Sequence, residues 1–232
     1  MTVSFIHRDP SFVVVDKPSG VAVHRGSSND ADNLMRRVRD ALGVWVYPVH
    51  RLDRGTSGAV LMALNPEAAS AFGRAFAEGR VRKRYVALTR GHPEDGDIDH
   101  AIPNDEDGPR VPALTRVRRL GVAGRYALVE AIPVTGRMHQ IRRHLKHVSC
   151  PIIGDVKYGK GEHNRHFRDS YDLHRLALHA TDLAFDHPFT GERLDFSVSM
   201  TGTLRACIEA LGLANVAGDE YPAFRGIPRR RD

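Results

Sequence analysis

The sequence predicts an α+β fold built on an antiparallel or mixed sheet. Short apolar runs typical of buried strands, such as residues 12–15 and 59–64, recur along the chain. The helix-like segments do not alternate regularly with these runs, as a doubly wound parallel sheet would require. The chain has 232 residues, of which 41% are hydrophobic, so it is long enough to bury a substantial core. We therefore expect an ordinary soluble globular protein.

Strands are expected where β-branched and apolar residues run between turn-forming residues. The run over 12–15 ends at a Lys-Pro-Ser-Gly turn, and the run over 59–64 follows a Gly-Thr-Ser-Gly turn. Residues 82–90 read as a strand that places Tyr85, Ala87 and Thr89 on one face. Further strands are expected over 126–133, 176–185 and 194–200.

Two helices carry clear start and stop signals. Asn33 is a good cap for a helix over 34–42, and Gly43 is suited to end it. Asn65 followed by Pro66 is a typical helix start, because proline is tolerated at the first helical position. That second helix is expected to end at Gly79.

The remaining elements are predicted from the spacing of apolar residues and from composition. A helix is expected over 137–148, with Ile141, Leu145 and Val148 forming its apolar stripe. A last helix is expected over 203–211. An exposed excursion is expected over 93–112, a single catalytic domain over 1–212, and a basic, partly flexible tail over 213–232.

The charge of the chain favours a polyanionic partner. The net charge is +6 at pH 7, although many basic proteins bind no nucleic acid. Basic side chains gather in two places, where they can neutralise phosphates. They are Arg80, Arg82, Lys83, Arg84 and Arg90 around Tyr85, and Arg137, Arg142, Arg143 and Lys146 further along the chain.

Other features bear on location and covalent chemistry. No apolar run approaches the ~20 residues of a membrane span, and the N-terminus lacks the pattern of a signal peptide. A cytoplasmic location without a membrane partner is therefore expected. The two cysteines, Cys150 and Cys207, are expected to be small buried residues that form no disulfide.

Residues 50–58, His-Arg-Leu-Asp-Arg-Gly-Thr-Ser-Gly, carry the strongest functional signal. Asp53 stands between Arg51 and Arg54, so its carboxyl group is expected to have a low pKa and to stay ionised. An ionised carboxylate suits a nucleophile and is a poor general acid. The alternative is a solvated, charged turn, because structural ion pairs also perturb pKa values.

These nine residues resemble the first signature of the RluA-type pseudouridine synthases, in which His-Arg-Leu-Asp precedes two variable residues and Thr-Ser-Gly. Residues 17–20 are similar to the family's Lys-Pro-x-Gly element. Residues 83–85, Lys-Arg-Tyr, resemble its second motif, and residues 136–142, Gly-Arg-Met-His-Gln-Ile-Arg, its third. The four motifs occur in the family's order. The resemblance implies a central sheet split by a cleft that holds the aspartate.

The resemblance also implies roles for individual residues. Asp53 is expected to start cleavage of the bond from ribose C1′ to uracil N1, with Arg142 as its ionic partner. If the third motif were aligned one residue further along, Arg143 would be the ionic partner of Asp53 in place of Arg142. Tyr85 is expected to stack on the uracil; the alternative is a core aromatic residue. Since substrate and product contain the same atoms, no cofactor and no metal ion is expected.

A uridine inside a helix must be extruded before it can react. By resemblance, Arg51 is expected to fill the gap that the base leaves; the alternative is an ion pair with a carboxylate. The residues expected to bind the substrate are Arg51, Arg54, Lys83, Arg137, His139, Gln140 and Ile141.

Two patterns invite other interpretations. Residues 154–161 nearly spell a phosphate-binding loop, but Gly161 stands where a Ser or Thr must hold Mg²⁺, and no good helix is expected to follow. His139, His144, His147 and Cys150 lie close in sequence but lack an established metal-ligand pattern. We expect a surface helix there that touches RNA backbone.

The substrate is expected to be tRNA. Residues 17–25 and 154–179 are most similar to the tRNA pseudouridine synthase C subgroup, which modifies uridine sixty-five. The small N-terminal RNA-binding domain of some relatives is expected to be absent. The alternatives are an enzyme acting on large-subunit rRNA or on both RNAs, and a non-catalytic RNA-binding protein on the same fold. A third hypothesis, a nucleotide-dependent transferase, is supported only by the likeness of residues 154–161 to a phosphate-binding loop. The protein is expected to be a monomer.

Overall fold

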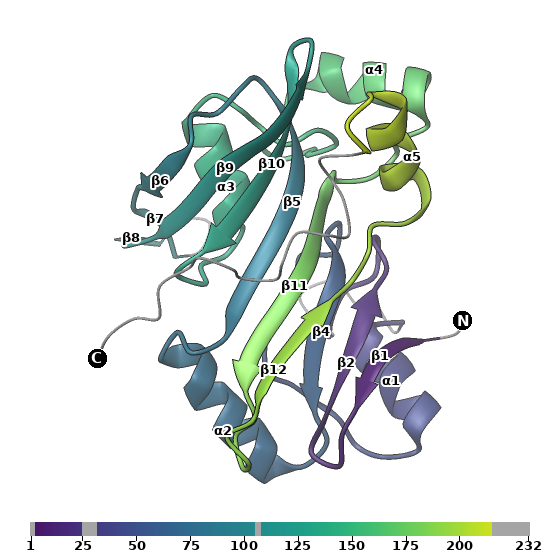
Figure 1. The fold of residues 1–232 in the computed structure, drawn as a ribbon, viewed down its shortest axis with the longest axis vertical. Helices are drawn as coiled ribbons and strands as arrows, with labels where there is room; N and C mark the ends of the chain where they lie inside the picture. Colours follow the sequence, from purple (N-terminus) through teal and green to yellow (C-terminus); the bar gives the residue numbers. More distant parts are fainter. Residues whose placement is uncertain (1–2, 25–31, 105–107, 215–232) are drawn as a thin grey trace.

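The computed structural model describes residues 3–24, 32–104 and 108–214, and a ten-stranded sheet runs through them (Figure 1). In sheet order the main strands are β1 (Ser4–Arg8), β2 (Phe12–Lys17), β4 (Ser57–Ala63), β11 (Leu178–Asp186), β5 (Arg82–Arg90), β10 (Tyr126–Pro133), β9 (Leu114–Ala123) and β6 (Gly96–Asp99). Within the described ranges, β4 and β11 are parallel and the other neighbours are antiparallel. The predicted α+β class with a mixed, mostly antiparallel sheet is confirmed.

Short strands complete the β structure. Beside the main path, β3 (Tyr47–Pro48) pairs with β4 and β12 (Arg193–Ser197) pairs with β11, while β7 (Ile102–Pro103) and β8 (Arg110–Val111) form a separate pair. The predicted excursion over 93–112 thus contains strands, and Ile102 within it is buried.

The flanking helices are α1 (Leu34–Leu42), α2 (Pro66–Ala77), α3 (Gln140–His147), α4 (Gly161–Tyr171) and α5 (Gly202–Ala210). The predicted caps are confirmed. The Asn33 side chain accepts a hydrogen bond from the Arg36 backbone at 3.0 Å, and the Asn65 side chain accepts one from Ala68 at 2.8 Å. Gly43 adopts φ 70°, a left-handed conformation suited to glycine.

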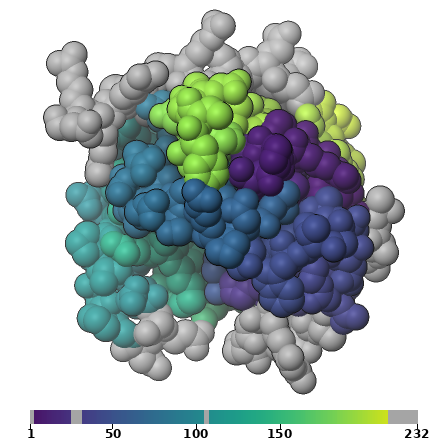
Figure 2. Space-filling view, turned by 90° about the horizontal axis from the view of Figure 1, so that it is seen from below, coloured from purple at the N-terminus to yellow at the C-terminus, as the bar shows by residue number. Residues whose placement is uncertain are grey.

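Aromatic packing fixes α2 against the sheet. Phe12 of β2, Phe72 of α2 and Phe185 of β11 are fully buried or nearly so. Their rings meet edge to face, with centroids 5.2–5.5 Å apart. Figure 2 shows this end of the molecule, where the blue surface of α2 adjoins the green end of the β11–β12 hairpin.

The helix predicted over 137–148 is shorter than expected. It begins at Gln140, because His139 has φ 54° and a left-handed residue cannot continue a right-handed helix. Val148, predicted to belong to the apolar stripe, lies beyond the helix and is 37% exposed. Ile141 and Leu145 are buried as expected.

The prediction that no helix follows residues 154–161 is wrong. Helix α4 begins at Gly161, although its sequence is mostly polar. Tertiary contacts hold it: Phe167 is fully buried, and the Asn164 side chain bonds the backbone of Gly154 and Asp155 at 2.8 and 2.9 Å. Strands β1 and β9 were not expected either; both lie near or at an edge of the sheet, with several exposed side chains.

A close backbone approach joins β4 to β11. Gly58 pairs with Ala180, and a Cβ atom added at Gly58 would lie 2.1 Å from the Ala180 carbonyl oxygen. Gly58 also has φ 110°, so glycine is required on two grounds. Ala180 in turn pairs with Tyr85 of β5. The glycine that ends residues 50–58 therefore lets three strands meet at one point of the sheet, which we call the sheet junction.

Buried charges reinforce the sheet beside this junction. Arg84 of β5 is bonded to Glu130 of β10 and, at 2.7 Å, to Asp182 of β11. Its exposure is 6%. The prediction that Arg84 neutralises phosphates is therefore wrong, because its guanidinium is committed to two carboxylates inside the protein.

The other general expectations concern cysteines and the chain ends. Cys150 and Cys207 are both free and buried, as predicted. Leu213, placed in the tail by the sequence, packs in the core with 4% exposure, and residues 215–232 lie outside the described part. None of the described helices has the length and apolar content that crossing a membrane requires.

His179 of β11 makes the stability of this core depend on pH. Its Nδ1 faces the Ser57 hydroxyl at 2.7 Å and its Nε2 the Val198 carbonyl at 2.9 Å. Burial lowers the pKa of His179 from 6.5 to about 4. Below pH 6.5 the unfolded chain binds a proton that the folded chain excludes, so this contribution is complete above pH 6.5 and is lost as the pH falls toward 4.

We expect the free energy of unfolding to fall between pH 6.5 and 4, and His179→Gln to reduce that slope by up to ~1.4 kcal/mol per pH unit. Urea unfolding at several pH values measures how the free energy of unfolding changes with pH. The matched control, His174→Gln, replaces a histidine whose side chain is 65% exposed and is expected to keep the wild-type slope. Equal slopes for wild type and His179→Gln would contradict the assignment.

Candidate active site

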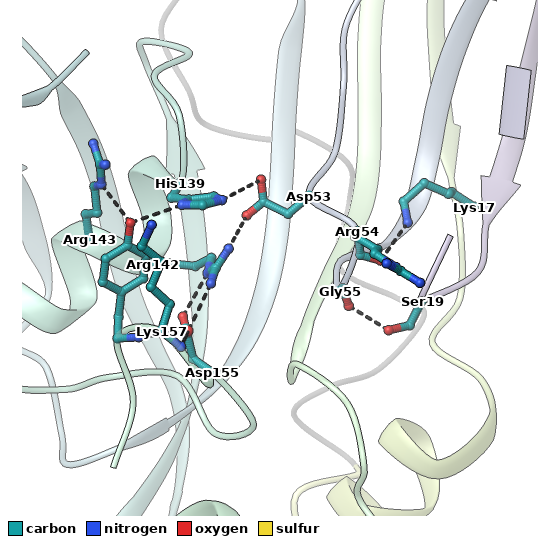
Figure 3. Close-up of polar contacts among 11 residues, drawn as sticks. Lys17, Ser19, Asp53, Arg54, Gly55, His139, Arg142, Arg143, Asp155 and Lys157 are labelled. Atoms are coloured by element: carbon teal, nitrogen blue, oxygen red, sulfur yellow. Dashed lines mark hydrogen bonds and ion pairs between the residues drawn. The ribbon is translucent and has the colours of Figure 1, made fainter. Parts of the chain in front are cut away.

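Asp53 lies on the turn that leads into β4, beside the sheet junction. The Lys-Pro-Ser-Gly turn after β2 packs against it, as Figure 3 shows. The Lys17 amine donates to the Arg54 carbonyl at 3.2 Å, and the Ser19 hydroxyl donates to the Gly55 carbonyl at 2.7 Å. Two segments identified separately in the sequence thus form one structure that fixes the backbone around Asp53.

Lys17 is the buried anchor of this structure. Its amine also donates to the carbonyls of Pro18 (2.9 Å) and Val21 (2.6 Å), and the residue has no exposed surface. Burial, followed by the positive charge of Arg175, lowers the pKa of Lys17 to about 7, while Asp53 opposes this shift. Lys17 therefore acts here as a hydrogen-bond donor to three carbonyls.

Arg142 of α3 holds the carboxylate of Asp53. Its Nη1 donates to Asp53 Oδ2 at 3.0 Å, across 89 residues of sequence. The alternative residue, Arg143, donates instead to the Tyr158 hydroxyl at 3.0 Å and to the Pro103 carbonyl at 2.5 Å. The geometry agrees with the predicted pairing of Asp53 with Arg142, and the flanking guanidinium of Arg54 donates to the Gly20 carbonyl.

A second carboxylate fixes Arg142 from the other side. Asp155 accepts two parallel hydrogen bonds from Arg142, at 2.8 and 2.9 Å, and its side chain is 1% exposed. Burial acts to raise the pKa of Asp155, but the bonds from Arg142 and from the Tyr158 backbone outweigh it and lower the pKa. A bidentate pair fixes the plane of a guanidinium, so Asp155 aims Arg142 at Asp53.

Tyr85 lies on β5, next to the sheet junction. It is 7% exposed, and burial, then the negative charge of Asp53, raise the pKa of its hydroxyl, which stays protonated. The effect of Asp53 indicates that the two side chains are electrostatically close. Lys83, two residues away, has its amine 5.8 Å from the Phe76 ring, and burial lowers the pKa of that amine.

His139 completes the surroundings of Asp53. Its Nε2 lies 3.8 Å from Asp53 Oδ1, and its Nδ1 lies 3.0 Å from the Tyr158 hydroxyl. Burial first, and then the charges of Arg142 and Arg143, lower the pKa of His139, while Asp53 opposes them. In Figure 3, His139 and Arg142 face the same carboxylate.

Two of the predicted substrate-binding residues sit inside the protein. The Gln140 amide nitrogen donates to the Leu114 carbonyl and to the Thr115 hydroxyl, both at 2.9 Å, and its oxygen accepts from the Arg137 backbone at 3.0 Å. Ile141 packs in the core. These contacts give both residues a part in positioning α3, and their direct contact with substrate stays a prediction.

The remaining basic candidates lie at the surface. Arg51 is exposed, and Arg137 is exposed with its Nε 3.2 Å from the Pro112 carbonyl. Arg54 is also exposed, although its guanidinium bonds Gly20. Arg51 and Arg54 adjoin Asp53 in the sequence and Arg137 lies shortly before α3, and phosphate contacts are expected from these side chains.

Sequence reasoning missed Asp155 and Tyr158 as parts of the site. Both lie in the segment 154–161 that resembles a phosphate-binding loop. The available signal was the Gly-Asp-x-x-Tyr-Gly pattern of residues 154–159. In the structure, Asp155 bonds Arg142 and Tyr158 contacts His139, so this segment positions charged side chains around Asp53.

The expectation of a surface helix over the histidines also needs correction. His144 is fully buried; its ring nitrogens lie 2.9 Å from the Thr115 hydroxyl and 2.9 Å from the His100 carbonyl. Arg142 is buried as well, so that only part of α3 can face RNA. In the described part of the chain, no group of three or more His, Cys, Asp or Glu residues is arranged to hold a metal ion.

The arrangement can present an ionised carboxylate to a substrate. Asp53 is partly exposed, with 22% of its side chain accessible, whereas Asp155 and Arg142 behind it are buried. Arg142 occupies Oδ2, and Oδ1 faces the weaker contact with His139. A neutral tyrosine lies close by. Such a site suits a reaction that begins with attack or proton removal by a carboxylate.

Comparison with known proteins places this site in a family. The model of the RNA pseudouridylate synthase family matches residues 11–147, and the chain belongs to that family, so it is a pseudouridine synthase. The match includes Asp53, Tyr85 and Arg142.

Curated relatives and solved structures agree with this assignment. The chain is 38% identical to a tRNA pseudouridine synthase C of Vibrio parahaemolyticus, covering 85% of this chain and 90% of that protein, and 37% identical to one of Salmonella typhimurium, covering 92% of both. Human RNA Pseudouridylate Synthase Domain Containing 4 has a similar structure, with a TM-score of 0.74, 26% identity and coverage of 90% of this chain and 93% of that one.

We expect Arg142→Lys to reduce the rate of pseudouridine formation by about 10- to 100-fold, because lysine cannot make the bidentate bond to Asp155 while it bonds Asp53. Tritium release from RNA labelled at uridine C5 measures the rate. Arg143→Lys is the matched control, and its effect is expected to be much smaller. Equal losses for the two variants would contradict the assignment of Arg142.

Proposed function

We propose that this protein isomerises uridine to pseudouridine in tRNA, at uridine sixty-five. The pairing of Asp53 with a buried, carboxylate-clamped arginine is the observation that supports catalysis. The tRNA substrate is supported by the relatives named tRNA pseudouridine synthase C, which this chain resembles over 85% or more of its length. We take the described core, up to residue 213, as one catalytic domain.

The reaction breaks the bond between ribose C1′ and uracil N1 and forms a bond between C1′ and uracil C5. Asp53 begins it, either by attack on C1′ or by removal of the C2′ proton, and both routes require an ionised carboxylate. Arg142 bonds the Asp53 carboxylate and fixes its orientation. The detached base then rotates, and C5 bonds to C1′ as the Asp53–C1′ bond breaks or, on the other route, as the C2′ proton returns. The C5 proton then leaves and N1 gains a proton.

Tyr85 is the residue that we propose to contact the uracil during this reaction. It lies within electrostatic range of Asp53 and at the junction of β5 with β11. Its ring can stack on the base, and its neutral hydroxyl can help with the C5 proton. Since Tyr85 is largely buried, the uracil reaches it only at the edge of the ring or after a small opening of the site.

RNA binding is assigned to the exposed basic side chains near this carboxylate. Arg51 is exposed and two residues from Asp53, so it suits the predicted part of filling the gap left by the extruded uridine. Arg137, shortly before α3, and Lys157, in the segment that carries Tyr158, are exposed as well. Phosphate contacts of this kind make affinity depend on salt.

Asp53→Asn is expected to lower tritium release from C5-labelled tRNA by at least about 10²-fold, because the amide cannot carry the negative charge that starts the reaction. Affinity for tRNA, measured by filter binding, is expected to stay within several-fold, since phosphate contacts supply most of it. Asp97→Asn is the matched control, because Asp97 is an exposed residue of β6 that pairs with Arg116.

The same assay distinguishes the substrates. Release from tRNA by wild type, mapped to position sixty-five, is the expected result. Tritium release from rRNA alone would support pseudouridine formation but overturn the assignment of tRNA as the substrate. Tight RNA binding without release from either RNA would favour a non-catalytic RNA-binding protein, and activity above a tenth of wild type in Asp53→Asn would exclude a nucleophilic Asp53.

A further inference from the structure

A chain of polar contacts runs to Asp53 from Arg143 through Tyr158, which both lie outside the family motifs, and through His139, which lies inside the third motif. Arg143 Nε donates to the Tyr158 hydroxyl at 3.0 Å, and that hydroxyl lies 3.0 Å from His139 Nδ1. The other ring nitrogen, Nε2, lies 3.8 Å from Asp53 Oδ1. The chain therefore orders four side chains, and His139 is the member that faces the reacting carboxylate.

The contacts determine which ring nitrogen carries the proton. Asp53 is an acceptor, so the nitrogen that faces it, Nε2, is stable there as N–H. Tyr158 can donate or accept, and its oxygen already accepts from Arg143. With the proton on Nε2, the Tyr158 O–H donates to the free lone pair of Nδ1. Each donor in the chain is then directed at an acceptor, although Nε2 lies 3.8 Å from Asp53 Oδ1.

The surroundings of His139 favour the neutral ring. Three cations act on it: Arg142 and Arg143 of α3, which directly follows His139, and Lys157 of the segment that carries Tyr158. Asp53 is the opposing anion. Together with burial, the cations lower the pKa of His139, so the imidazolium form is disfavoured at neutral pH.

The backbone holds the ring in this place. His139 has φ 54°, in the left-handed region that few residues adopt, directly before α3. The Tyr158 ring packs against the imidazole at 5.6 Å and 72°, and the Arg142 guanidinium lies 5.1 Å from the Tyr158 ring centre. Tyr158 thus contacts both groups that face Asp53.

We propose that Tyr158 is a positioning residue: its hydroxyl holds His139 in the neutral Nε2–H form, with that N–H directed at Asp53 Oδ1. Arg142 occupies Oδ2 at 3.0 Å, whereas the 3.8 Å contact of His139 is too long for a full hydrogen bond. Oδ1 consequently keeps its lone pairs for the ribose and is the oxygen that reacts. The reactive role given to Oδ1 rests on the proposed function, in which Asp53 begins the reaction.

The tautomer is measured first, in free protein with ¹⁵N-labelled histidine. His139 is assigned by the signals that disappear in His139→Gln. The expected spectrum shows a protonated Nε2 and an unprotonated Nδ1 in wild type, and a mixture of both tautomers in Tyr158→Phe. A wild-type proton on Nδ1, or an unchanged spectrum in Tyr158→Phe, would overturn the proposal. This measurement uses no RNA, so it stands even if the proposed function fails.

Single-turnover pseudouridine formation on saturating tRNA tests the consequence. Tyr158→Phe keeps the ring contacts and removes one hydroxyl, so the rate is expected to fall about 3- to 10-fold with unchanged tRNA affinity. The matched control is Tyr171→Phe at the end of α4, whose rate is expected to equal wild type. A Tyr158→Phe rate equal to wild type, or a loss of affinity in place of rate, would contradict the assignment.

Two replacements of His139 separate the roles of its nitrogens. Glutamine can place an amide N–H near the position of Nε2, whereas asparagine is too short to reach Asp53 but suits the left-handed backbone. We expect His139→Gln to retain more single-turnover activity than His139→Asn. Activity of His139→Asn equal to or above that of His139→Gln would overturn the role of the Nε2–H donor.

Discussion

Arg142 is bonded by two carboxylates, and the geometry of the site depends on this arrangement. Asp155 fixes the plane of the guanidinium from the buried side, and Asp53 receives its remaining donor on the accessible side. Because the three residues come from α3, the segment before α4 and the turn before β4, the interaction can form only when the sheet has assembled. The Asp53 carboxylate is therefore placed by the whole fold.

Such a cluster contributes orientation more than stability. Two carboxylates share one guanidinium, so one negative charge remains uncompensated among the three groups, with Lys17 and His139 nearby as polar neighbours. Burying ion pairs carries a desolvation cost that often cancels the attraction. What the cluster provides is an Asp53 carboxylate held in one orientation while 22% of its side chain stays accessible.

The sequence predicted much of this structure for physical reasons. Caps such as Asn33 and Asn65 act locally, and the family motifs identified Asp53, Tyr85 and Arg142. Helix α4 and the role of Asp155 depend on contacts between distant segments, which composition and periodicity do not record. The mistaken role of Arg84 has the same cause, because a basic residue on a strand does not reveal that two carboxylates will enclose it.

A double-mutant cycle tests the central claim, that Asp155 acts on the reaction through Arg142. It compares single-turnover rates of wild type, Asp155→Asn, Arg142→Lys and the double variant, with folding of each checked by circular dichroism. If Asp155 acts through Arg142, the double variant is about as slow as Arg142→Lys alone. Losses that multiply in the double variant would show that Asp155 and Arg142 act independently and would contradict the account.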